Sequence, residues 1–182
     1  MRFAVEWTTN RISLSERNAR LLSQEFHSLL EQLAEMPARV RELVSDLTDG
    51  ELARKPSQKE FSMLEQVCHL RDIEQEGYAF RIKEILSRSA PLLPDIDGEK
   101  LARERRYNEQ NTSLALSLLT RARQENVRTL SSLRLDQLER TGNLEQVGPI
   151  TLERLLLMMR EHDLGHLKDL SGLRTRLIGQ TK

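Results

Sequence analysis

The sequence TLERLLLMMREHDLGHLKDLSGLRTRL, residues 151–177, decides the fold. Its core-facing positions recur at steps of three and four residues, which is the spacing of one face of an α-helix. They are Leu152, Leu155, Met159, His162, His166, Leu170, Leu173 and Leu177. His162 and His166 stand where leucine is expected, and because they are one turn apart, their imidazoles can converge on one point. The pattern predicts a helical bundle that holds a metal ion.

The composition favours helices and a single domain. Leucine occurs 33 times against 6 valines and 7 isoleucines, and 31% of the 182 residues are charged while 4% are aromatic. The formal net charge is zero and the sequence has no long apolar run, so we expect neither a nucleic-acid partner nor a membrane span. Residues 1–11 lack the apolar core of a signal peptide, and the single cysteine fits a reducing cytoplasm.

Three further segments carry helical patterns. Residues 22–47 show a seven-residue apolar repeat, which Pro37 should kink or divide. Ser62 and Glu65 form a capping box, after which a second helix runs to about Ser87. Its apolar face comprises Met63, Val67, Leu70, Ile73, Gly77 and Phe80. After a long crossover, Thr112 or Ser113 caps a third helix. Its inner face comprises Leu114, Leu118, Ala122, Leu130 and Leu133.

The segments outside these helices are expected to be loops or extensions. Proline and glycine exclude regular helix from residues 91–98, where a long crossover begins, and residues 141–143 and 148–149 frame another loop. Residues 1–17 form an N-terminal extension in which residues 3–9 are a short strand or a strap packed by Trp7. The folded domain is therefore expected to span residues 18–182.

The histidines carry the predicted chemistry. Neutral imidazole is a good ligand for Zn²⁺, Ni²⁺, Fe²⁺ or Cu²⁺, and catalytic metal sites often have three protein ligands. His162 and His166 provide two, and His69 is the best-placed third ligand because a bundle sets the second and last helices side by side. The alternative is that these histidines are hydrogen-bonded packing residues. His27, the fourth histidine, is predicted to be structural or on the surface.

Several runs of sequence resemble the DinB/YfiT-like family. They are residues 69–74 (HLRDIE) with Arg81-Ile82, and residues 148–152 (GPITL) with His162-Asp163 and His166-Leu167. The resemblance covers roughly residues 21–170 and implies an all-α, up-down-down-up four-helix bundle with a long crossover between helices 2 and 3. It also implies a divalent metal held by His69, His162 and His166, with Zn²⁺ or Ni²⁺ expected before Fe²⁺ or Mn²⁺. Phe61 departs from the tryptophan that this family often carries before the cap serine.

The resemblance suggests two classes of function. Family members with known activities are thiol-dependent transferases and isomerases that use bacillithiol or mycothiol, and many others are candidate hydrolases. The first expectation is therefore an enzyme whose metal activates water or a low-molecular-weight thiol for a small-molecule substrate. The alternative is a non-catalytic metal-binding or stress-response protein acting as a dimer. Family members are often homodimers, so a homodimer is expected here.

Residues near the predicted metal have open roles. Glu76, two turns after His69, is the candidate general base or fourth ligand, or else a solvated carboxylate at the rim of the site. Asp72 and Asp163 either orient a ligand by accepting its ring N–H or form plain salt bridges. Cys68 points away from His69 and is expected to pack in the core. Arg123 either meets an anionic substrate or is an exposed charge.

Overall fold

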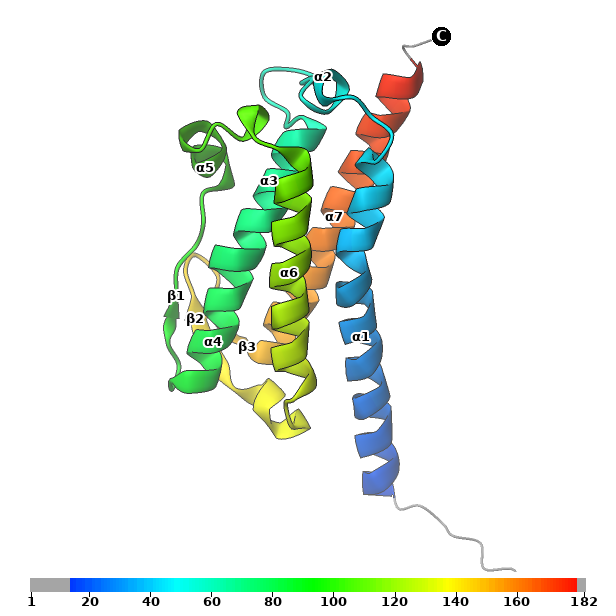
Figure 1. Ribbon diagram of the computed structural model, residues 1–182. Helices are drawn as coiled ribbons and strands as arrows, with labels where there is room; N and C mark the ends of the chain where they lie inside the picture. Colours follow the sequence, from blue (N-terminus) through cyan, green and yellow to red (C-terminus); the bar gives the residue numbers. More distant parts are fainter. Residues whose placement is uncertain (1–13, 180–182) are drawn as a thin grey trace, which may run out of the picture.

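The computed structural model describes residues 14–179, in which four long helical segments form a bundle (Figure 1). These segments are α1 (Leu14–Val44), the continuous run of α3 (Met63–Asp72), the π-helical turn η1 (Ile73–Tyr78) and α4 (Ala79–Ser87), then α6 (Thr112–Ser131) and α7 (Leu152–Gly179). The chain runs up, down, down and up, which confirms the expected topology. α1 packs against α6 and α7, and α3 packs against α6. α3 also contacts α7, so these two helices are neighbours in the bundle.

The connections contain short elements that complete the fold. α2 (Asp49–Leu52) follows α1, and η3 (Leu135–Glu139) follows α6. The crossover holds β1 (Leu92–Leu93), α5 (Gly98–Glu104) and η2 (Tyr107–Glu109). β1 pairs in parallel with β2 (Thr141–Leu144), and β2 pairs antiparallel with β3 (Gly148–Thr151). The sequence pattern did not predict these three strands, although the sheet is minor beside the helices.

The capping signals locate three helix starts. The Ser62 side chain accepts a hydrogen bond from the backbone N–H of Glu65, while the Glu65 carboxylate accepts from the N–H of Ser62. This confirms the predicted capping box. Thr151 caps α7 by accepting from the N–H of Arg154. α6 is capped instead by Asn111, a residue that competes well with threonine at this position.

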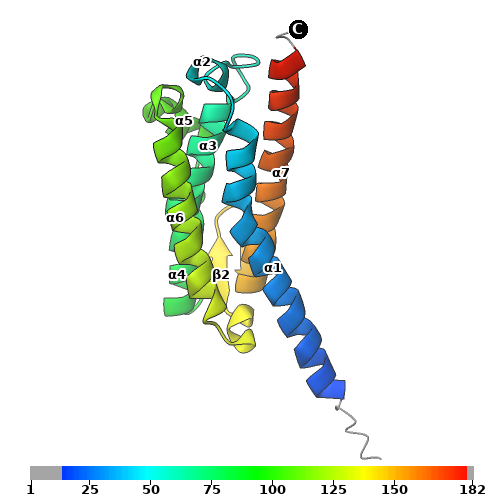
Figure 2. The same ribbon diagram turned by 45° about the vertical axis from the view of Figure 1, so that its right-hand side comes forward.

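Pro37 does not divide the first helix, because α1 is continuous through it. Proline has no N–H and so leaves the carbonyl of Leu33, four residues earlier, without its helical partner. The Arg123 guanidinium donates to that oxygen at 2.7 Å. Figure 2 shows the first half of α1 leaning away from the other helices. α1 begins at Leu14, and the predicted strand or strap at residues 3–9 lies outside the described residues.

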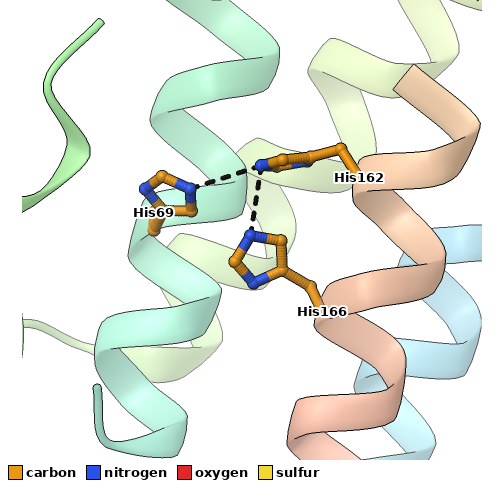
Figure 3. A group of neighbouring side chains, drawn as sticks. All are labelled: His69, His162 and His166. Atoms are coloured by element: carbon orange, nitrogen blue, oxygen red, sulfur yellow. Dashed lines mark hydrogen bonds between the residues drawn. The ribbon is translucent and has the colours of Figure 1, made fainter. Parts of the chain in front are cut away.

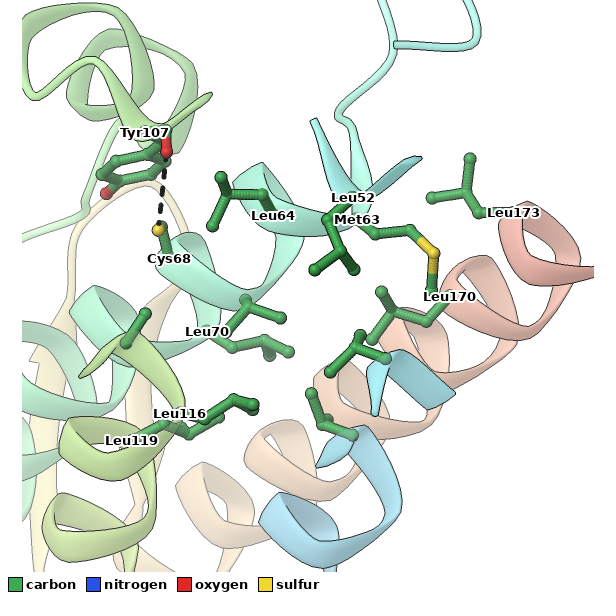
Figure 4. Close-up of a cluster of buried hydrophobic side chains, with 14 of the residues drawn as sticks. Leu52, Met63, Leu64, Cys68, Leu70, Tyr107, Leu116, Leu119, Leu170 and Leu173 are labelled. Carbon is green, nitrogen blue, oxygen red and sulfur yellow. Dashed lines mark hydrogen bonds between the residues drawn. The ribbon is translucent and has the colours of Figure 1, made fainter. Parts of the chain in front are cut away.

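Two apolar clusters fill the bundle, one near each end. Figure 4 shows the cluster at the end of α3 where Met63, Leu70 and Leu116 meet the last turns of α7. Cys68 lies in this cluster with its thiol near the Tyr107 carbonyl, and burial raises its pKa to about 11. The prediction of a packing role for Cys68 is therefore confirmed. The apolar positions of the α7 stripe are all buried.

Two predicted apolar faces were partly wrong. Phe80 is 39% exposed, because the π-helical turn η1 adds a residue to its turn and rotates the rest of the helix. Tyr78 and Ile82 are buried in its place. Leu114 is 59% exposed, since the first turns of α6 turn Ala115 and Leu116 inward instead. Among the described helices, none has the length and apolar character needed to cross a membrane.

Candidate metal centre

The three predicted ligands converge between two antiparallel helices. His69 projects from α3, and His162 and His166 project from α7 (Figure 3). The His162 Nε2 atom lies 3.4 Å from His69 Nε2 and 3.1 Å from His166 Nε2. One ligand nitrogen from each ring lies within 4.8 Å of the others. The sequence-based grouping of these three histidines is therefore confirmed as a spatial cluster.

The spacing of the nitrogens fits a divalent ion. Tetrahedral zinc with Zn–N bonds of about 2.0–2.1 Å separates its ligand nitrogens by roughly 3.3 Å. The two Nε2–Nε2 separations at His162 lie on either side of this value. Hydrogen bonds between the rings explain this arrangement less well than a bound ion does. His162 Nε2 faces two other ring nitrogens, but a single ring nitrogen can form only one ordinary hydrogen bond. A cation between the rings would accept all three lone pairs at once.

Burial keeps the imidazoles in the neutral form that binds metal. Desolvation lowers the pKa of His69 and of His162 to about 4. Smaller contributions come from His166, which lowers the pKa of His69, and from His69, which lowers the pKa of His162. Desolvation and the adjacent His162 lower the pKa of His166 to about 3. All three histidine residues nevertheless remain partly accessible to solvent. The three imidazoles are thus neutral at pH 7, so each keeps one ring nitrogen with a free lone pair that an ion can reach.

Gln66 is a residue of this site that the sequence reasoning missed. Its side-chain oxygen contacts Nδ1 of His166. A carbonyl oxygen accepts but does not donate, so Nδ1 carries the proton and Nε2 keeps its lone pair for the metal. Gln66 precedes His69 by three residues, so the helical spacing that puts both on one face was the available signal.

The two aspartates next to the ligands do not orient them. Asp72 accepts from Arg71, from Arg105 and from the Tyr107 hydroxyl, while Asp163 pairs with Arg123. The structure therefore favours the salt-bridge alternative for both. Within residues 14–179, Nδ1 of His69 and Nδ1 of His162 have no hydrogen-bond partner.

Glu76 lies at the rim, with its carboxylate taken up by another partner. Both of its oxygens accept from the Arg105 guanidinium, at 2.6 and 2.9 Å, and its side chain is 49% exposed. The π-helical turn that contains Glu76 also changes its angle relative to His69. Its predicted role as a base or ligand stays a prediction, and the ion pair favours the rim alternative.

Arg123 is buried, so the expectation of an exposed charge was wrong, and its carboxylate partners leave it no free charge for an anionic substrate. It is 2% exposed and forms ion pairs with Glu74 of η1 and Asp163 of α7. Asn126 also donates to Glu74. This buried network joins α6 to the two helical segments that carry the histidines. His27 is on the surface as predicted, with Nδ1 near the Ser23 carbonyl.

A cavity of about 530 Å³ opens beside the cluster. Its wall includes the ligand His166 and its partner Gln66, together with Phe61 and Leu173. Charged side chains of both signs, among them Lys59, Glu99, Asp169 and Arg176, also line it. The cavity is large enough for a small molecule, and it would place that molecule next to His166, the one ligand of the three that lines it.

The comparisons with known proteins agree with this arrangement. Residues 32–170 match the family model of the DinB superfamily. Among solved structures, the chain is similar to YfiT from Bacillus subtilis, described as a probable metal-dependent hydrolase with an unusual four-helix bundle topology. The TM-score is 0.77 at 22% sequence identity, covering 92% of this chain and 91% of that one, and such a likeness shows the fold. No curated protein matches the chain significantly.

Proposed function

The chain belongs to the DinB superfamily, and on that premise we propose that it is a metal-dependent hydrolase that holds one divalent ion through His69, His162 and His166. The observation that carries the proposal is the convergence of the Nε2 atoms of three neutral imidazoles, one of which, His166, lines a cavity. The similarity to YfiT, itself described as a probable metal-dependent hydrolase, supports the same class of reaction. Zn²⁺ and Ni²⁺ are the ions we expect first.

The geometry favours an enzyme over the non-catalytic alternative. A storage or structural site would surround its ion with four protein ligands, whereas a catalytic site leaves positions open. Among the described residues, His69, His162 and His166 are the one group of three or more side chains with the arrangement of metal ligands. The adjoining cavity gives a substrate access to the remaining positions.

Each part of the site has a separate task in this proposal. A divalent ion at the three histidines would supply Lewis-acid chemistry. His69, His162 and His166 offer the lone pairs, and Gln66 fixes the tautomer of His166. The cavity holds the substrate beside them, with Phe61 and Leu173 as its apolar surface. The use of a low-molecular-weight thiol, the homodimer and the cytoplasmic location stay predictions.

Hydrolysis by the metal-loaded protein is the test of this proposal. We expect cleavage of a panel of small esters and amides by protein loaded with Zn²⁺ or Ni²⁺, and at least a hundredfold slower cleavage by His162→Ala, because two imidazoles hold the ion poorly. His27→Ala removes a surface histidine and should leave the rate unchanged. Equal rates for metal-free protein, metal-loaded protein and His162→Ala would contradict a metal-dependent hydrolase.

A further inference from the structure

The crossover passes directly over one of the three histidines at Gly98. This residue begins α5 just after Asp97, whose carboxylate caps the helix by accepting from the N–H of Lys100. A Cβ atom built on Gly98 would lie 2.5 Å from Cε1 and 2.7 Å from Nδ1 of His69. The φ angle of Gly98 lies outside the left-handed region. Glycine is therefore required here for the space it leaves to His69 and not for its backbone conformation.

The backbone of the crossover is held in place on both sides of Gly98. Before it, the Pro94 carbonyl accepts from both Nε and Nη2 of Arg81, at 3.3 and 2.8 Å. After it, Arg105 donates to Asp72 at 2.7 Å, and the Tyr107 hydroxyl donates to the same carboxylate at 2.6 Å. Because these contacts tie the crossover to helix α3 and its continuation, the backbone at Gly98 has little freedom to move outward.

The imidazole of His69 is less firmly held than the crossover. Its Nδ1 faces Gly98 and has no hydrogen-bond partner in the part of the chain that the structure describes. The Phe61 ring is a second neighbour, with ring centroids 5.7 Å apart. His166, in contrast, has Gln66 at its Nδ1. Packing against Gly98 and Phe61 thus takes the place of a hydrogen bond in orienting His69, and the ring is the part that gives way under a clash.

We propose that Gly98 is a positioning residue for the metal centre, because its bare backbone leaves the space in which the His69 ring directs Nε2 at His162 and His166. The inference rests on the proposed metal site and extends it to the crossover. A side chain at position 98 turns His69 away, which leaves His162 and His166 as a weaker two-histidine site. The apo protein tolerates this change, since it moves the end of a flexible side chain.

Zinc binding by Gly98→Ala tests the proposal. The dissociation constant for Zn²⁺, measured by competition with a chromophoric chelator, should rise about 10–100-fold, the range typical of changes around metal ligands. The melting temperature of the apo protein should stay close to that of the wild type. Gly165→Ala is the matched control: it lies next to His166, and a Cβ there meets nothing within 4 Å. Its dissociation constant should equal that of the wild type.

Repeating the substitution in the His69→Ala variant separates an effect on the His69 ring from a general disturbance of the metal site. In His69→Ala, adding Gly98→Ala should not weaken Zn²⁺ binding further, because the clashing ring is absent. The inference would be overturned if Gly98→Ala bound Zn²⁺ as tightly as the wild type. It would also be overturned if Gly98→Ala weakened Zn²⁺ binding equally in the wild type and in His69→Ala. If the wild type itself binds no Zn²⁺, Ni²⁺, Fe²⁺ or Mn²⁺, the proposed metal site fails, and the inference fails with it.

Discussion

Replacing Arg123 with methionine should lower the free energy of unfolding by about 3–5 kcal/mol, the cost of removing one partner from a buried ion pair. The guanidinium lies between the carboxylates of Glu74 and Asp163, at 2.8 and 2.7 Å. Methionine has a similar unbranched stem but leaves both carboxylates in the core without their cation. It also leaves the Leu33 carbonyl, freed by Pro37, without its donor.

Urea unfolding at neutral pH would measure this loss. Arg121→Met is the control, because Arg121 is on the same helix but pairs with Glu125 on the solvent side. Surface pairs of this kind contribute about 0–1 kcal/mol, so the control should change stability little. Similar small losses for Arg121→Met and Arg123→Met would contradict a stabilising role for the buried network.

The metal-free protein should lose stability steeply as the pH falls from about 6.5 toward 4. Burial holds the pKa of His69 and His162 at about 4 and that of His166 at about 3. The unfolded chain takes up protons on these residues below a pKa of about 6.5. Within this window the unfolded state binds more protons than the folded state, so acid favours unfolding. Each histidine contributes up to about 1.4 kcal/mol per pH unit.

Denaturant unfolding of the metal-free protein at pH 7 and pH 5 would measure the effect. The triple variant His69→Gln, His162→Gln and His166→Gln keeps polar side chains of similar size without these proton sites, so its stability should change much less over the same window. Saturating metal should move the loss in the wild type to lower pH, because protons and metal compete for the same nitrogens. Equal pH dependence in the wild type and the triple variant would contradict the assignment.

The sequence pattern was sufficient for the parts of the fold that depend on apolar spacing. The stripe of α7 is regular from Leu152 to Leu177, so one helical period places both His162 and His166 on the core side. The capping box at Ser62 fixes where helix α3 begins, and hence the face from which His69 projects. The three histidines lie on only these two helices, so it was enough to predict correctly which face of each helix points into the bundle.

The remaining features depend on contacts between distant segments. The π-helical turn η1 adds one residue to a turn, which no apolar period signals, and it therefore shifted the expected face at Phe80. Arg123 has the sequence context of a surface residue, and its burial follows from two carboxylates and a carbonyl on three other segments. Gly98 shows its role only once the crossover lies over His69.

The amount of divalent metal bound per chain tests the central claim most directly. Purified protein, stripped and then equilibrated with Zn²⁺ or Ni²⁺, should retain close to one ion per chain by elemental analysis, because three imidazoles converge at one site. The triple variant His69→Ala, His162→Ala and His166→Ala should retain none while its circular dichroism stays helical. Full occupancy in the folded triple variant, or no retention of either ion by the wild type, would contradict a three-histidine metal centre.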